Sequence, residues 1–300
     1  MSGRFQLRGL RFAACAVALS ACVLALPACA AGGESAGDAG TAGASARLDS
    51  GFRKLYELNF SGARSEFVSY QQDQPGDPLG KAAEAASYLY EQLNAKGVFT
   101  SAFFLNDEKF LNGVDGTAKA NRNDRFINAN AQAREMARQN LSASPRDARA
   151  LLVLTLTDGM ESDYLAIVEK RQLASLHLVR HAEADAVKLL AVDPSAQDAY
   201  LALGVTNYVI GCMPAYKKAF LWFDGIHGDR RRGIHQLELT AANGHYLRPF
   251  AKILLALAYE RERQADRAKP LFAELAGEFP ANPLYARELT LADRAAPDSR

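Results

Sequence analysis

Hydrophobic residues recur at intervals of three and four along most of the chain, from about Leu48 onward. This spacing places apolar side chains on one face of a helix, and no sustained stretch alternates apolar and polar residues as a half-buried strand would. One long helix face is marked by Leu173, Leu176, Val179, Ala182, Ala186 and Leu189. The pattern predicts an all-α domain over residues 48–295.

Four prolines divide this domain into helical runs. Each of them follows a helical run by a residue or two and is followed by another run; they are Pro75, Pro145, Pro194 and Pro280. Proline cannot continue a helix and is common just beyond its C-terminus. We therefore predict helices that follow one another in antiparallel pairs.

The stretch "ILLALAYERERQADRAKPLFAEL", residues 253–275, places small and large side chains in a regular order. Ala256 and Ala268 are small, whereas Tyr259 and Phe272 are aromatic. Small residues let two helices of a hairpin approach to about 8 Å where they cross. The aromatic residues would then fill the space between one hairpin and the next.

These residues resemble the tetratricopeptide repeat (TPR), whose pattern is W-x2-L-G-x2-Y…A-x3-F…P over about 34 residues. Leu255 and Pro280 complete the match, and Lys252 occupies the place of the tryptophan. Partial matches to the same pattern are Tyr200, Leu203 and Gly204, then Ala182 and Ala186, and then Ala63, Phe67 and Pro75.

The resemblance implies a TPR-like α-solenoid, an array of antiparallel helix hairpins. The two intervals after Pro145 exceed whole repeats, and we expect an insertion at 212–235. The Gly- and Asn-rich stretch 93–127 is expected to be another insertion. The stretch 225–262 is also similar to exported bacterial TPR proteins whose role is not settled. A generic helical bundle is the alternative fold.

The first thirty residues are typical of a secretory signal peptide. Basic residues between Arg4 and Arg11 precede an apolar run at 12–26, and "ACA" at 28–30 matches a signal-peptidase site. We expect cleavage there and a periplasmic or secreted protein. The alternative is lipidation at Cys29, because "LPAC" resembles a lipobox. Lipidation would anchor the protein to the envelope.

Residues 31–47 are rich in Gly, Ala and Ser and are interpreted as a flexible linker.

Composition bears on two further questions, nucleic-acid binding and disulfide formation. The formal net charge is +1 and charged residues make up 23% of the chain, which gives no electrostatic reason to expect nucleic acid as a partner. Cys212 is the single cysteine of the predicted domain, so no internal disulfide can form there.

Candidate chemistry is sparse. "HLVRH" places His177 and His181 at the i, i+4 spacing of zinc proteases, but Leu178 replaces their glutamate and no third ligand is evident. His227, His235 and His245 match no zinc pattern, and the motifs of phosphate and dinucleotide binding are absent. We predict a protein that is not an enzyme, with no catalytic residue, cofactor or metal.

The resemblance to TPR proteins implies that a peptide or protein partner binds in a groove lined by the first helix of each pair. In this register the lining residues are Asp198, Leu201, Val205 and Tyr208 in one repeat, and Phe250, Ile253, Leu257 and Glu260 in the last clear repeat. The sequence therefore predicts an interaction scaffold.

Arginines form a further candidate contact. Asp229 is expected to cap a helix whose first turn holds Arg230, Arg231 and Arg232. Cations at this end oppose the helix dipole, which suggests an acidic partner or lipid headgroup.

The aromatic segment 213–223 supports the alternative function, a peripheral envelope protein acting at a membrane surface. The aromatic segment 98–110 is expected to be a long loop with a short helix.

Overall fold

A computed structural model of the chain describes residues 36–215, 218 and 227–295, and every regular element in this part is helical. The signal segment 1–30, including Cys29, lies outside the described residues, as does most of segment 213–223. The elements are α1 (Ala36–Tyr56), α2 (Phe60–Asp73), α3 (Pro78–Ala95), α4 (Ser101–Phe104), α5 (Asp107–Asn112), α6 (Asp124–Ala143), α7 (Ala148–Asp163), the π-helix η1 (Tyr164–Val168), α8 (Gln172–Val192), α9 (Ala199–Cys212), α11 (Arg230–Asn243), α12 (Arg248–Arg261), α13 (Ala265–Glu278) and α14 (Pro283–Ala295).

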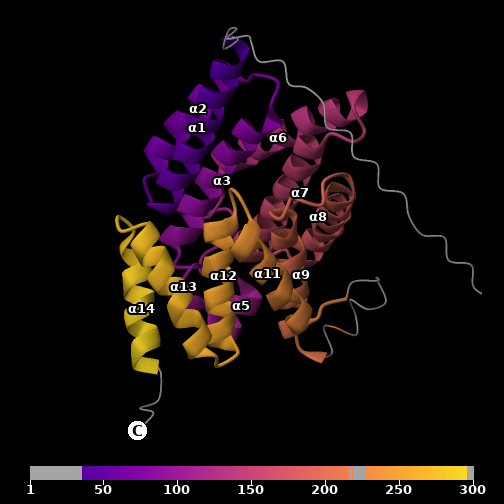
Figure 1. Ribbon diagram of the computed structural model, residues 1–300. Helices are drawn as coiled ribbons and strands as arrows, with labels where there is room; N and C mark the ends of the chain where they lie inside the picture. Colours follow the sequence, from indigo (N-terminus) through magenta and orange to yellow (C-terminus); the bar gives the residue numbers. More distant parts are fainter. Residues whose placement is uncertain (1–35, 216–217, 219–226, 296–300) are drawn as a thin grey trace, which may run out of the picture.

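The long helices pack as successive hairpins (Figure 1). The pairs are α1 with α2, α3 with α6, α7 with α8, α9 with α11, and α12 with α13, and each pair packs on the next. Helix α14 covers α13 at the end of the array. The predicted all-α array of antiparallel hairpins is confirmed, and its TPR-like order follows from this pairing.

Helix boundaries follow local sequence signals. Four helices end shortly before the four prolines: α2 at Asp73, α6 at Ala143, α8 at Val192 and α13 at Glu278. Side-chain caps begin several others, because a carboxylate or amide oxygen accepts one of the free N–H groups of the first turn. Asp229 caps α11 in this way, as predicted, by accepting from Arg232 N at 2.9 Å.

Small residues lie where paired helices cross. Ala256 and Ala268 are fully buried between α12 and α13, and Phe272 is buried beside them. Helices α9 and α11 also approach closely, at Gly204 and Gly233. A β-carbon on Gly233 would lie 2.5 Å from Tyr208 N and 2.8 Å from Gly204 O, inside van der Waals contact with fixed backbone. The predicted role of small residues at the crossings is confirmed.

The first helix begins earlier than the sequence suggested. Residues 36–47 belong to α1, so the prediction of a flexible linker over 31–47 is wrong for this part. Ala44 is 3% exposed and Leu48 is 1% exposed, in the same core as α2. Alanine is the strongest helix former, and a small helix face can pack closely even though it buries little area per residue.

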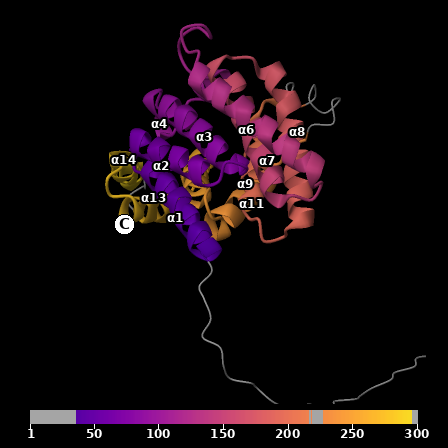
Figure 2. The same cartoon turned by 90° about the horizontal axis from the view of Figure 1, so that it is seen from above.

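The array closes on itself. The end of α1 and helix α3 meet the last helices and the turns between them, which lie on the same side of the molecule (Figures 1 and 2). Tyr56 Oη in α1 donates to Tyr246 O at 2.8 Å, and Asn282 Nδ2 donates to Tyr56 O at 2.9 Å. The Phe52 ring stacks on Tyr246 with 4.8 Å between centroids. One hydrophobic core consequently runs from α1 to α14.

The close crossing of α9 and α11 predicts the effect of a single methyl group. Gly233→Ala should lower the free energy of unfolding by about 2–3 kcal/mol, because the β-carbon has only backbone to displace. Gly159→Ala in α7 is the matched control, since nothing lies within 4 Å of its β-carbon. That control should stabilise the protein by about 0.5–1 kcal/mol. Urea unfolding followed by circular dichroism measures both, and equal stability of the two variants would contradict the close crossing.

Candidate interaction surfaces

The predicted groove face of α12 is covered by the chain itself. Ile253 is 1% exposed and Leu257 is fully buried, and Phe250 is partly buried. The Phe250 ring meets Phe99 edge-on at 5.6 Å and Tyr90 at 5.9 Å. The prediction that these residues line an accessible groove is wrong, because α3 and the segment after it occupy that space.

The predicted groove face of α9 is buried against α12 and the turn before it. Tyr208 is 2% exposed, and its hydroxyl donates to Ala258 O at 3.3 Å. Leu201 is buried in the same core, with Val205 packed against it. These residues also fail to form an open groove.

Asp198 has a structural role that the sequence did not reveal. Its buried carboxylate accepts three consecutive backbone N–H groups, from His245 at 2.9 Å, Tyr246 at 3.0 Å and Leu247 at 3.3 Å. This carboxylate therefore fixes the turn between α11 and α12. The prediction of Asp198 as a partner contact is wrong, because its carboxylate is buried and bonded to this turn.

Residues 98–110, here called the strap, pack against α12. The strap contains α4 and most of α5 and buries Phe99, Phe103 and Phe104. Arg261 at the end of α12 holds it by donating to Phe104 O and pairing with Asp107. The Arg261 guanidinium also lies over the ring of Phe110, 4.3 Å from its centroid.

Two carboxylates lie next to the strap. Glu288 in α14 is 1% exposed; its Oε2 accepts from Ser101 N at 3.1 Å, and its Oε1 has no partner among the described residues. The Oε1 atom of Glu260 in α12 is likewise buried without a partner in the described part of the chain. Burial raises the pKa of Glu260, and the charge of Glu288 raises it further. The two carboxyl groups thus lie close enough to repel each other when ionised.

The three arginines at the start of α11, here called the arginine turn, are exposed. Arg230 pairs with Glu262 at 3.2 Å. Burial raises the pKa of Glu183, and the charge of Arg232 partly lowers it, which places Arg232 near Glu183. Arg231 has no partner in the described part of the chain. The arginine turn is accessible, in contrast to the predicted groove residues.

The histidines are distributed over separate contacts. The rings of His177 and His181 lie 4.0 Å apart, and His181 Nδ1 is 3.9 Å from a carboxylate oxygen of Asp158. His235 faces Glu238 at 3.5 Å and His245 faces Asp49 at 3.2 Å. Within the described residues, no group of three or more His, Cys, Asp or Glu residues is placed to hold a metal ion.

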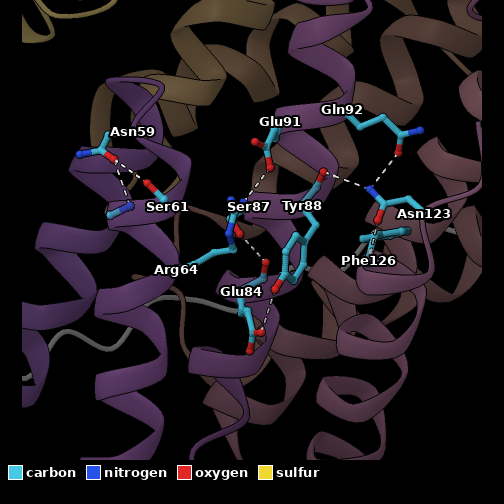
Figure 3. Close-up of polar contacts among 11 residues, drawn as sticks. Asn59, Ser61, Arg64, Glu84, Ser87, Tyr88, Glu91, Gln92, Asn123 and Phe126 are labelled. Carbon is cyan, nitrogen blue, oxygen red and sulfur yellow. Dashed lines mark hydrogen bonds and ion pairs between the residues drawn. The ribbon is translucent and has the colours of Figure 1, made fainter.

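A shallow surface hollow of about 460 Å³ lies between α3 and the start of α6. Its amide groups are already used: Asn123 Nδ2 donates to Tyr88 O at 3.3 Å and to Gln92 Oε1 at 3.1 Å (Figure 3). On the neighbouring surface, Arg64 pairs with Glu91 at 2.8 Å. These contacts fasten the chain before α6 to α3 and serve the fold.

Sequence reasoning missed the residues that hold the strap. Arg261 directly follows Glu260 in the sequence, but it lies outside the helix face from which the groove residues were selected. Glu288 lies in α14, beyond the last motif match. The described residues also contain no helix long and apolar enough to cross a membrane.

The chain was compared with family models, curated proteins and solved structures. No family model and no curated protein matches the chain. Among solved structures, a thermophilic TPR protein of Thermus thermophilus is similar, with 15% sequence identity and a TM-score of 0.45. The match covers 84% of this chain and 99% of that one. The TPR-like description of this chain therefore rests on its own helix pairing.

Proposed function

We propose that this protein is a non-enzymatic scaffold for protein–protein interaction, and that it binds an acidic segment of a partner through the arginine turn. The observation that carries the proposal is three exposed arginines in one helical turn, of which Arg231 has no partner in the described part of the chain. Helical hairpin arrays present broad surfaces of this kind to other proteins.

The arginine turn is costly for the isolated protein. Cations in the first turn oppose the positive end of the helix dipole, and this arrangement costs about 0.3–1 kcal/mol per charge at the surface. A partner carboxylate would offset that cost and form paired N–H···O bonds with a guanidinium. An acidic segment therefore suits the turn better than a neutral or basic one.

Affinity capture tests the proposal. The bait begins at residue 31, so that it includes all of α1, and is incubated with a cell-envelope extract of the source organism. The control bait carries Arg230→Ala, Arg231→Ala and Arg232→Ala. We expect a protein retained by the native bait to lose at least about 90% of its binding with this control, a tenfold change that corresponds to about 1.4 kcal/mol.

A second triple variant separates position from total charge. Arg122, Arg125 and Arg146 are exposed arginines in another region, and their replacement by Ala removes the same charge. Capture by this variant should be unchanged. Equal loss with both triple variants, or retention by the first, would contradict the role of the arginine turn.

We also propose that the protein is exported, on the basis of its basic and apolar N-terminal segment. Intact-mass measurement of the protein from its native host tests this. Cleavage after Ala30 should give an unmodified chain that begins at residue 31. A chain that begins at a diacylated Cys29 would establish the lipid-anchored alternative, and a full-length chain would contradict export.

A further inference from the structure

We infer that the strap covers a second interaction surface on α12 and α14, and that this surface takes a short aromatic segment of a partner protein carrying a basic residue that pairs with Glu260 and Glu288. The inference deepens the proposed scaffold function and rests on it, but it uses a surface separate from the arginine turn.

The strap occupies the surface as a bound peptide would. Its aromatic side chains Phe99, Phe103 and Phe104 enter the core, while Leu105 on its outer side is 49% exposed. Its main-chain groups are held from outside by two side chains, Arg261 of α12 and Glu288 of α14. Figure 2 shows α4 near α14. Short aromatic anchors in an apolar groove are a common mode of peptide recognition.

Glycines in the left-handed conformation bracket this segment. Gly97, with φ of 72°, lies two residues after the end of α3, and Gly113, with φ of 82°, directly follows α5. These residues separate the strap from the regular helices on either side. Such a segment can open without the melting of α3 or α6, because local opening follows the boundaries of packed units.

The closed strap leaves two carboxylates, those of Glu260 and Glu288, without a neutralising cation in the described structure. Burying an ionised carboxylate destabilises the fold unless its oxygen atoms are hydrogen-bonded or paired with a cation. Glu288 Oε2 accepts from Ser101 N, but Glu288 Oε1 and Glu260 Oε1 are buried without a partner among the described residues. Arg261, the residue after Glu260 in the chain, is directed toward Phe104 O and Asp107 of the strap. Opening the strap would expose both carboxylates to water. Glu260 and Glu288 therefore lower the stability of the closed strap, although they line the surface that it covers.

The chemistry of the missing group defines the partner. A lysine or arginine between the two carboxylates would neutralise their repulsion and satisfy the orphan oxygen atoms. The strap offers at this place only the backbone N–H of Ser101. A partner segment with similar aromatic anchors and a basic residue in place of Ser101 should therefore displace the strap.

Hydrogen exchange of the intact chain tests whether the strap opens and what opposes it. The amides of Phe103, Phe104 and Leu105 are hydrogen-bonded within the strap and report its opening. We expect Arg261→Met to speed their exchange at least tenfold, because it removes the clamp. We expect Glu260→Gln to slow it about tenfold, because a neutral amide gains less from hydration.

Glu274→Gln is the matched control, since Glu274 is exposed and pairs with Lys252 outside the strap. It should leave the exchange of the strap unchanged. The inference is overturned if the strap amides exchange together with those of core helix α7 in the native chain. It is also overturned if Glu260→Gln speeds their exchange.

Peptide binding tests the chemistry of the partner. Residues 98–110 are replaced in the full chain by a Gly-Ser linker of equal length, and fluorescent peptides are added. One peptide has the strap sequence, and the other carries Ser101→Lys. Both should bind, the lysine peptide at least tenfold more tightly, and the intact chain should bind each at least tenfold more weakly.

Replacing Glu260 and Glu288 together by Gln should abolish the advantage of the lysine peptide. Equal affinity of the two peptides, or no binding to a folded linker variant, would overturn the inference. If the linker variant does not fold, the exchange measurement on the intact chain decides. A negative result in the peptide and exchange measurements would not affect the proposal for the arginine turn. A negative result in affinity capture would likewise not change the exchange rates of the strap, so the two proposals can be tested separately.

Discussion

The architecture depends on how one tyrosine in the turn before α12 is held. The ring of Tyr246 stacks on Phe52 of α1, its carbonyl accepts from Tyr56, and its amide donates to Asp198 of α9. Burial raises the pKa of the Tyr246 hydroxyl, and a hydrogen bond with Arg149 of α7 partly lowers that pKa. One residue thus joins the start, middle and end of the array.

This closure changes how the helices stabilise one another. In an open repeat array each hairpin contacts only its neighbours, so stability is a sum of local terms. Here the last hairpin also packs on the first, and residues separated by 190 and 226 positions share hydrogen bonds. The aromatic residues around Tyr56, which include Tyr90 and Phe279, seal the contact. We expect α1 and α12 to unfold together with the core rather than as fraying ends.

The sequence predicted what local chemistry controls. Proline fixes where a helix can end, and Gly204 and Ala256 fix where two helices can cross, because both constraints act within a few residues. The same rules failed for residues 36–47, where many alanines and glycines gave too weak an apolar period to mark a helix. In the structure, packing on α2 stabilises this helix and outweighs its low hydrophobicity.

The groove could not be predicted in the same way. Phe250, Ile253 and Leu257 repeat along one helix face whether that face is open to a partner or covered by the chain, so their spacing carries no information about access. What decides access is the strap, which reaches α12 from a distant part of the sequence. Arg261 bonds to Phe104 O across 157 positions, and no local pattern encodes such a contact.

The two proposed surfaces meet at the end of α12. Glu262 pairs with Arg230 of the arginine turn and also lies 3.4 Å from the hydroxyl of Tyr208. Arg261, the next residue in the chain, clamps the strap. An acidic segment that binds Arg230 competes with Glu262 for the same guanidinium, and it does so one residue away from the clamp. Neighbouring residues of opposite charge at the end of α12 therefore hold two segments that lie far apart in the sequence, the arginine turn and the strap.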